Sequence, residues 1–178
     1  QMKQAGAAEV NLVVSSTGLP AAKELQKKFG TPYVVGVPMG DQFAAVVMKA
    51  LDKAIITGKS QIAYDKRAMC GGDTVIIGES IYSESLAAAL ALEKDMKVKV
   101  LCPLETEDDL LLSEDILAED EDSIMLQLQN AAVVIADPIY SRIIQPGTKF
   151  ISLPHEAFSG RIYRKDIPDL VDNIDIIQ

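Results

Sequence analysis

An alternation of apolar strand-like runs with helix-like stretches constrains the fold of this chain more than any other feature. It is clearest in the middle of the sequence, where Thr74–Ile77 is a short β-branched run of the kind that buried parallel strands require. A loop at 78–80 leads into an alanine- and leucine-rich stretch, and Lys97–Cys102 is the next strand-like run. The segment predicts a βαβ unit whose helix is capped by Ser80 or Ser83.

The same alternation extends on both sides of this unit and predicts an α/β fold with Rossmann-like, doubly wound parallel sheets. A polar stretch that closes with Gly71-Gly72 interrupts the pattern. We therefore expect a Rossmann-like lobe at 1–60, a linker at 61–72 and a C-terminal Rossmann-like domain at 73–178. The further predicted strands are Val10–Ser15, Tyr33–Val37, Ala132–Ala136 and Lys149–Leu153, and the further helices are Ala21–Phe29, Gln42–Ile56, Ile124–Asn130 and Ile139–Ile144.

Composition excludes several classes of function. The chain has 178 residues, 48% of them hydrophobic, and a net charge of −9, which argues against a nucleic-acid or anionic-membrane partner. We expect a soluble cytoplasmic protein. Cys70 and Cys102 belong to no CxxC motif or Cys/His cluster, so no metal ligands are predicted. We expect the acidic segment Glu105–Asp122 to be exposed and weakly ordered at least in part, because like charges need partners when buried.

Ligands of parallel α/β folds bind beyond the carboxyl ends of the strands, which makes the loop 78–80 the first candidate site. Gly78, Glu79 and Ser80 could hold a phosphate or carboxylate at the following helix N-terminus, although Glu79 would oppose an anion. The alternative is an ordinary turn. The chain has neither a dinucleotide fingerprint nor a P-loop. The strand ends at Val14, Gly78, Cys102, Asp137 and His155 are expected to face one side of their sheets.

His155, the sole histidine of the sequence, follows a predicted strand directly. It could serve as a ligand or as a proton donor near neutral pH, or it could be structural. Arg161 and Arg164 lie just beyond it and could pair with acidic groups of a substrate, since a guanidinium binds a carboxylate through two hydrogen bonds. The alternative is that both arginines are surface residues.

Three stretches of the chain form a recognisable set. They are the strand-helix unit Thr74–Met96, the passage AVVIADPIYSRIIQPGTKFISLP at 132–154, and a turn after the first predicted helix that contains Phe29, Gly30, Pro32, Tyr33, Pro38 and Gly40. This set resembles the C-terminal part of nitrogenase component 1 type oxidoreductases, with the first two stretches similar to the family's last domain. The family includes the nitrogenase subunits, their cofactor-assembly scaffolds and light-independent protochlorophyllide and chlorophyllide reductases.

The resemblance implies a subunit of three Rossmann-like domains, of which this chain covers roughly the last half and is inactive alone. A cofactor or tetrapyrrole substrate would sit in a cleft among the domains. The full-length protein would carry an iron–sulfur cluster or metallocofactor, with none bound by this portion alone. The implied partners are an ATP-dependent iron–sulfur reductase and a similar subunit in a homo- or hetero-oligomer. Arg161 and Arg164 could then hold tetrapyrrole carboxylates.

Two positions bear on the substrate. In nitrogenase the iron–molybdenum cofactor is ligated by one cysteine and one histidine. The position of that histidine resembles that of His155, which precedes Phe158-Ser159-Gly160. Val14 stands at the cysteine position, and valine cannot ligate iron, which argues against dinitrogen. Two other hypotheses stay open. The protein could be a non-catalytic scaffold for assembly of a metallocluster or tetrapyrrole cofactor, or a small-molecule binding module of two lobes.

Overall fold

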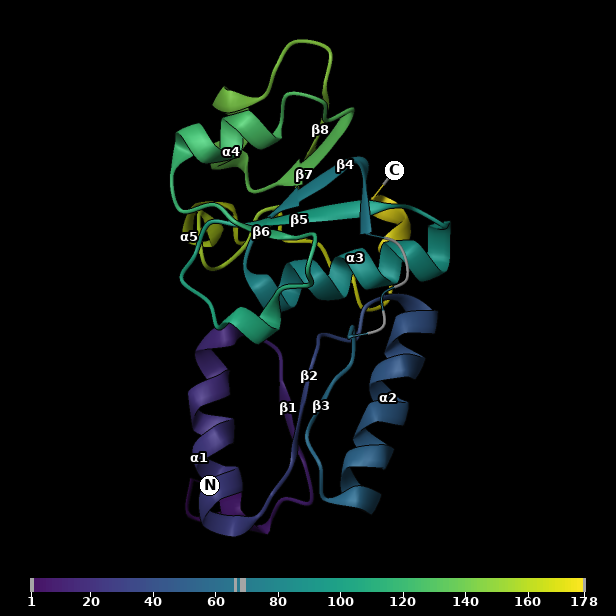
Figure 1. The fold of residues 1–178 in the computed structure, drawn as a ribbon, viewed down its shortest axis with the longest axis vertical. Helices are drawn as coiled ribbons and strands as arrows, with labels where there is room; N and C mark the ends of the chain where they lie inside the picture. Colours follow the sequence, from purple (N-terminus) through teal and green to yellow (C-terminus); the bar gives the residue numbers. More distant parts are fainter. Residues whose placement is uncertain (1, 66, 68–69, 178) are drawn as a thin grey trace.

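The computed structural model of the protein describes residues 2–65, 67 and 70–177. It is an α/β structure with a three-stranded and a five-stranded sheet, in which every described strand pairing is parallel (Figure 1). The smaller sheet has the strand order β1-β2-β3 and lies between two helices. Its elements are β1 (Asn11–Val13), α1 (Leu19–Phe29), β2 (Tyr33–Val35), α2 (Gly40–Thr57) and β3 (Gln61–Ile62).

The larger sheet has the order β6-β5-β4-β7-β8. The chain runs from β4 outward to β5 and β6, then returns to place β7 on the other side of β4. The β4–β7 junction is therefore the point where the winding direction reverses, and ligands of such sheets bind at this kind of junction. The strands are β4 (Cys70–Ile77), β5 (Val98–Cys102), β6 (Ile116–Leu117), β7 (Val133–Ala136) and β8 (Lys149–Ser152), and the helices are α3 (Ser80–Lys94), α4 (Glu121–Gln127) and α5 (Gly160–Tyr163).

Short 3-10 segments complete the described structure. They are η1 (Met2–Ala7), η2 (Ser16–Gly18), η3 (Asp108–Leu110), η4 (Pro138–Ile143) and η5 (Ile174–Ile176). The 3-10 segment η4 stands where a short α-helix was predicted after β7.

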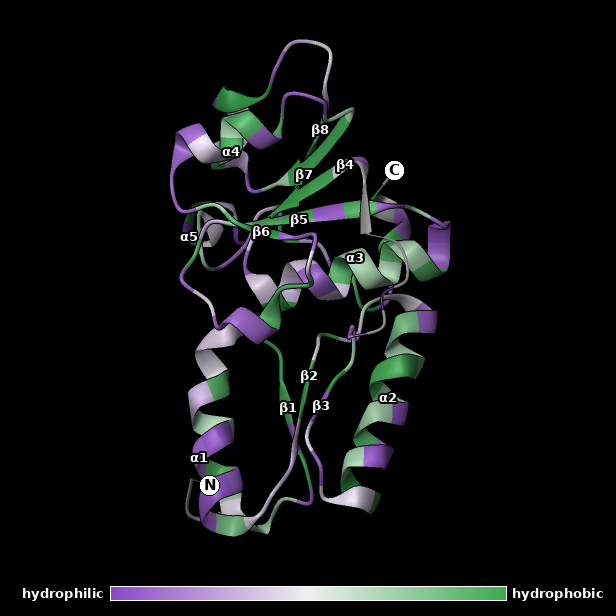
Figure 2. Cartoon of the chain, in the orientation of Figure 1, coloured by the Kyte–Doolittle hydropathy of each residue, from purple (hydrophilic) through white to green (hydrophobic). Residues whose placement is uncertain are grey.

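The helix α3 lies between the two sheets (Figure 1). Leu86, Ala87 and Leu90 are fully buried, and one hydrophobic core extends through them from β1 and β2 to β5. Figure 2 shows that β4, β7 and β8 of the larger sheet are coloured mainly as hydrophobic. Hydrogen bonds also cross the boundary, since Ser85 Oγ accepts from the Val37 backbone N–H at 2.9 Å. The two lobes therefore share one interior.

The predicted strands and long helices are present, with different ends. The segment 61–72, expected to be a linker, contains β3 and the first residues of β4, so its two ends belong to the two sheets. Glu79, rather than Ser80 or Ser83, is the N-cap of α3, and its carboxylate accepts from the Tyr82 N–H in the first turn. The side chain of Cys70 lies outside the described part of the chain.

The acidic segment 105–122 is exposed over most of its length, as predicted, but some of its side chains are buried. The side chain of Asp115 has no exposed surface, because it pairs with the buried Arg67. Leu110 and Ala118 are also buried. Among the described residues, no helix combines the length and apolar character that crossing a membrane requires.

Candidate functional site

The carboxyl ends of the strands in the larger sheet meet at one edge. Ile77 lies opposite both Leu101 and Ala136, and Ala136 lies opposite Ser152. The residues that follow these strands therefore leave the sheet on the same side. This places Gly78 and Glu79 after β4, Cys102 at the end of β5, Asp137 after β7 and His155 shortly after β8. Gathering at this edge follows from parallel pairing, as predicted.

Asp137 organises the loops at the winding junction. Its carboxylate is buried and accepts four hydrogen bonds: Oδ1 from the Ile139 N–H at 3.1 Å and the Ser159 hydroxyl at 2.6 Å, and Oδ2 from the backbone N–H groups of His155 at 3.0 Å and Ser159 at 3.2 Å. Burial opposes ionisation, but the donors, led by the Ser159 hydroxyl, hold the pKa of Asp137 below its ordinary value. Asp137 is therefore ionised, and its hydrogen bonds join η4 to the loop 155–160.

The ring of His155 is held on both sides by aromatic side chains. Its centroid lies 4.6 Å from that of Tyr82 in an edge-on arrangement and 6.0 Å from that of Phe158. Burial lowers the pKa of His155 below its ordinary value, against the attraction of the Glu79 and Asp137 carboxylates. The imidazole is therefore neutral near pH 7.

The backbone fixes the tautomer of this imidazole. The Ala157 N–H donates to His155 Nδ1 at 3.1 Å, so Nδ1 is an acceptor and carries no proton. In a neutral ring the proton then resides on Nε2. His155 accordingly presents an N–H donor at Nε2, while the lone pair of Nδ1 is already used.

Glu79 occupies the position where an anion was predicted to bind. Its buried carboxylate accepts from the Tyr82 N–H at 2.9 Å, in the first turn of α3, and from the Ser16 N–H of the smaller lobe at 2.6 Å. A second anion at this helix end would meet a buried negative charge. The Ser80 hydroxyl is also already hydrogen-bonded within the protein, since it lies 2.8 Å from the hydroxyl of Thr106. The loop 78–80 therefore joins the lobes rather than offering a phosphate cradle.

Gly78 packs closely against α3. A Cβ atom at this position would lie 2.5 Å from Ser83 Oγ, so a larger residue would require the Ser83 side chain to shift.

Arg161 and Arg164 lie on or beside α5 and are exposed. Arg164 Nε is 3.9 Å from Glu156 Oε1, and both side chains extend into solvent. The Gly160 N–H donates to the His155 carbonyl at 3.0 Å, which ties the start of α5 to the histidine loop. The two arginines are therefore next to His155 along the chain but outside the buried polar cluster of Glu79 and Asp137.

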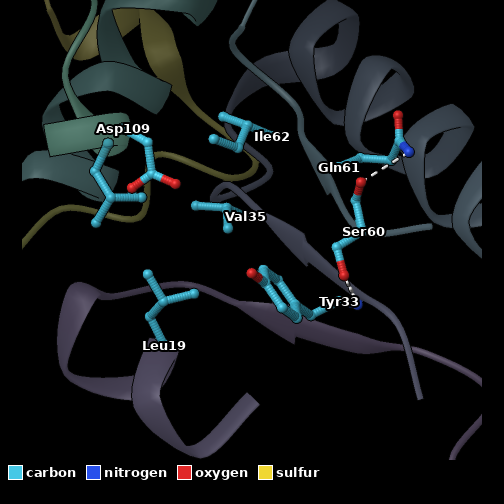
Figure 3. A pocket seen from close by; sticks show the side chains of 8 residues that line it. Leu19, Tyr33, Val35, Ser60, Gln61, Ile62 and Asp109 are labelled. Carbon is cyan, nitrogen blue, oxygen red and sulfur yellow. Dashed lines mark hydrogen bonds between the residues drawn. The ribbon is translucent and has the colours of Figure 1, made fainter. Parts of the chain in front are cut away.

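The described residues line cavities near this edge and between the lobes, of which three bear on a ligand site. The one drawn in Figure 3 has a volume of about 200 Å³ and lies beside β2 and β3, where Ser60 accepts hydrogen bonds from the Tyr33 N–H and the Gln61 amide. A second, of about 250 Å³, lies between the β1–α1 loop at Ser16 and the acidic segment at Thr106. Both are smaller than the roughly 300 Å³ at which ordinary ligand pockets begin. The third has about 430 Å³ and is lined by Pro103, Glu119, Asp120, Glu121, Ile124, Ile139, Tyr140, Arg142 and Ile143.

The described residues contain no group of three or more His, Cys, Asp or Glu side chains that could hold a metal ion. Cys102 Sγ donates to the Leu104 carbonyl at 3.3 Å, and burial raises the pKa of its thiol. The arrangement at this edge can donate a hydrogen bond from His155 and can hold a fixed negative charge at Glu79 and Asp137. We did not predict that Asp137 joins the loops at this edge. The sequence feature that could have revealed this role is the position of an aspartate directly after a buried strand.

The fold and the edge together define a class, an α/β protein with parallel sheets and a buried polar cluster where the larger sheet reverses its winding. No protein-family model, curated protein sequence or solved structure matches the chain.

Proposed function

We propose that this chain is the C-terminal part of a nitrogenase component 1 type oxidoreductase. In that protein it would take electrons from an ATP-dependent iron–sulfur reductase and reduce a substrate other than dinitrogen, bound between domains. The resemblance of the turn at 29–40 and of the passage at 132–154 supports the proposal. The α/β fold with parallel sheets agrees with what that family predicts.

The observation that carries the proposed role of this portion is the fixed tautomer of His155. With Nδ1 accepting from Ala157, Nε2–H is the group that can meet a substrate at the carboxyl edge of the sheet. A neutral imidazole in this state donates a hydrogen bond to an oxygen or nitrogen on which charge develops during reduction. This role differs from metal ligation, which needs a free ring lone pair.

The redox group would be held elsewhere in the longer protein, since the described residues offer no set of three metal ligands. An iron–sulfur cluster or metallocofactor supplies single electrons when bound. The residues of this chain would bind and orient the substrate. Arg161 and Arg164, being exposed beside the histidine loop, would pair with its acidic groups.

The test uses the full-length protein, purified without oxygen, together with its reductase and a tetrapyrrole carboxylate as trial substrate. Turnover is measured as ATP-dependent consumption of reducing equivalents, and visible and magnetic resonance spectra report the cluster. We expect His155→Ala to lower turnover at least tenfold, about 1.4 kcal/mol of transition-state stabilisation. His155→Gln should retain more turnover than His155→Asn, because the amide nitrogen of glutamine reaches the position of Nε2. Arg161→Gln and Arg164→Gln should raise KM and leave kcat unchanged.

Unchanged turnover of His155→Ala with the cluster intact would remove His155 from the mechanism. Greater activity of the asparagine variant would assign the role to Nδ1 instead. A bound cluster or tetrapyrrole without reductase-dependent turnover would place the protein among cofactor-assembly scaffolds. A full-length protein with neither would favour the two-lobed binding module.

A further inference from the structure

A second buried polar cluster lies on the other side of α3, away from His155. It consists of Arg67 from the segment joining the two sheets, Glu84 from α3 and Asp115 from the acidic segment. None of the three side chains has exposed surface. Arg67 Nη2 forms an ion pair with Asp115 Oδ2 and lies 3.3 Å from Glu84 Oε2. Arg67 Nη1 donates to the Val98 carbonyl of β5 at 3.0 Å.

Among the residues that the structure describes, the cluster has one cation and two carboxyl groups. If both carboxyls were ionised, these three side chains would carry a net negative charge in the interior, which is costly. A single proton shared within the cluster removes this charge. The hydrogen bonds decide which carboxyl holds it.

Asp115 has the better donors. Its Oδ1 accepts from the Val100 N–H at 2.6 Å, and its Oδ2 pairs with Arg67. Glu84 Oε1 accepts a long hydrogen bond from the Leu112 N–H at 3.3 Å. Glu84 Oε2 is buried and accepts no hydrogen bond from the described residues. The lack of a donor to Glu84 Oε2 is explained if this oxygen carries the proton and donates a hydrogen bond to Asp115.

We infer that Glu84 is protonated at neutral pH, and that Arg67, Glu84 and Asp115 form a pH-sensitive latch. The latch holds the segment joining the lobes against β5. When the proton leaves, the cluster gains an unbalanced negative charge, and the hold on Arg67 and on the neighbouring strand weakens. This inference is independent of the proposed oxidoreductase function.

Other ionisable groups face the latch from the packed elements. The pKa of Glu84 is raised to about 8, because burial and the neighbouring Asp115 raise it by more than Arg67 lowers it. Tyr64, whose hydroxyl donates to the Leu110 carbonyl at 3.1 Å, and Cys102 both have raised pKa values, chiefly through burial. Both therefore stay neutral where Glu84 titrates. The carboxylates of Glu79 and Asp109 act on Tyr64 from farther away.

The sign of the pH effect follows from the raised pKa. An unfolded glutamate titrates near pH 4.3, so the folded protein holds the proton more tightly than the unfolded chain. The contribution to stability is complete below that pH and is lost as the pH rises toward about 8. Relative to Glu84→Gln, which cannot titrate, the folding equilibrium constant of the natural protein should fall about tenfold per pH unit between about pH 5.5 and 7.5.

The experiment combines infrared spectroscopy with urea unfolding of the 178-residue chain across this range. We expect a carbonyl band of a buried protonated carboxyl group near pH 6 that disappears as the pH passes about 8. The band should be absent from Glu84→Gln. Glu114→Gln, which removes an exposed carboxylate next to Asp115, is the matched control and should keep both the band and the pH slope.

Asp115→Asn gives a second route if Glu84→Gln fails to fold. It leaves one carboxyl facing Arg67, so Glu84 should ionise and the band should vanish near pH 6 although Glu84 is intact. A natural protein without the band near pH 6 would overturn the inference. So would a band that persists in Glu84→Gln, or a stability ratio that does not change with pH.

Discussion

Asp137 and Glu84 are both buried acids within one small protein, yet their pKa values are shifted in opposite directions. Asp137 accepts four hydrogen bonds at the carboxyl edge of the larger sheet, and its pKa is lowered. Glu84 accepts one long hydrogen bond on the far side of α3, and its pKa is raised. The comparison teaches that burial alone does not set the charge of a carboxyl group. The number and quality of its donors do, even where an arginine is in contact.

The largest effect is expected from replacing Arg67, the cation that contacts Glu84. Arg67→Met would leave two carboxyl groups facing each other without a cation, and we expect it to cost about 3–5 kcal/mol of unfolding free energy. Urea unfolding near pH 7 measures the loss. Arg142→Met, on the exposed part of η4, is the control and should change stability by less than about 0.5 kcal/mol. A loss for Arg67→Met as small as that of the control would mean that the cluster contributes little.

Asp137→Asn should have the next largest effect, because an amide nitrogen would face N–H groups that now donate to a carboxylate. We expect a loss of about 2–3 kcal/mol near pH 7. The lowered pKa of Asp137 gives a stability contribution that is present above the unfolded value of about 3.9 and is lost as the pH falls through the lower folded value. Unfolding curves below about pH 4 should therefore converge for the natural protein and the variant. If the unfolding free energies of the two proteins instead differed by the same amount at every pH, Asp137 would not be ionised in the folded protein.

Ser159→Ala should give the smallest effect, since it removes one of the four hydrogen bonds to Asp137. We expect a loss of about 1.5 kcal/mol and a rise in the pKa of Asp137 toward its ordinary value. Nuclear magnetic resonance titration of the carboxyl carbon measures the second quantity. Ser152→Ala, at the exposed end of β8, is the control. An unchanged pKa would show that the backbone donors suffice.

Much of the fold could be predicted from the sequence because its strands are apolar, β-branched runs and its helices have apolar spacing. The two-residue strands β3 and β6 could not, since so short a segment shows no periodicity. The capping role of Glu79 was hidden by the serines beside it. At the carboxyl edge of the larger sheet, the sequence predicted where the polar residues lie but not the hydrogen bonds that they form. Parallel topology places Asp137 and His155 near each other, but four donors on one carboxylate require the folded loop.

The latch was missed for a different reason. Arg67, Glu84 and Asp115 come from three separate elements, and Asp115 lies in a segment whose charges predict exposure. The signal that could have revealed it is Glu84 itself. It lies one turn into a helix whose following residues are alanine and leucine on every face, so its side chain had to be buried as well.

The position of α3 between the lobes has a consequence for how the protein is made. The smaller lobe comes first from the ribosome, but part of the surface that covers it belongs to a helix that ends at Lys94. Until that helix has left the exit tunnel, Val37 lacks the Ser85 hydroxyl that its N–H donates to, and the apolar residues of the smaller lobe lack the α3 side chains of their shared core. Translation should therefore expose an incomplete, apolar lobe for the time needed to make the next part of the chain. A chaperone that binds nascent chains should be engaged during that interval and released once α3 docks.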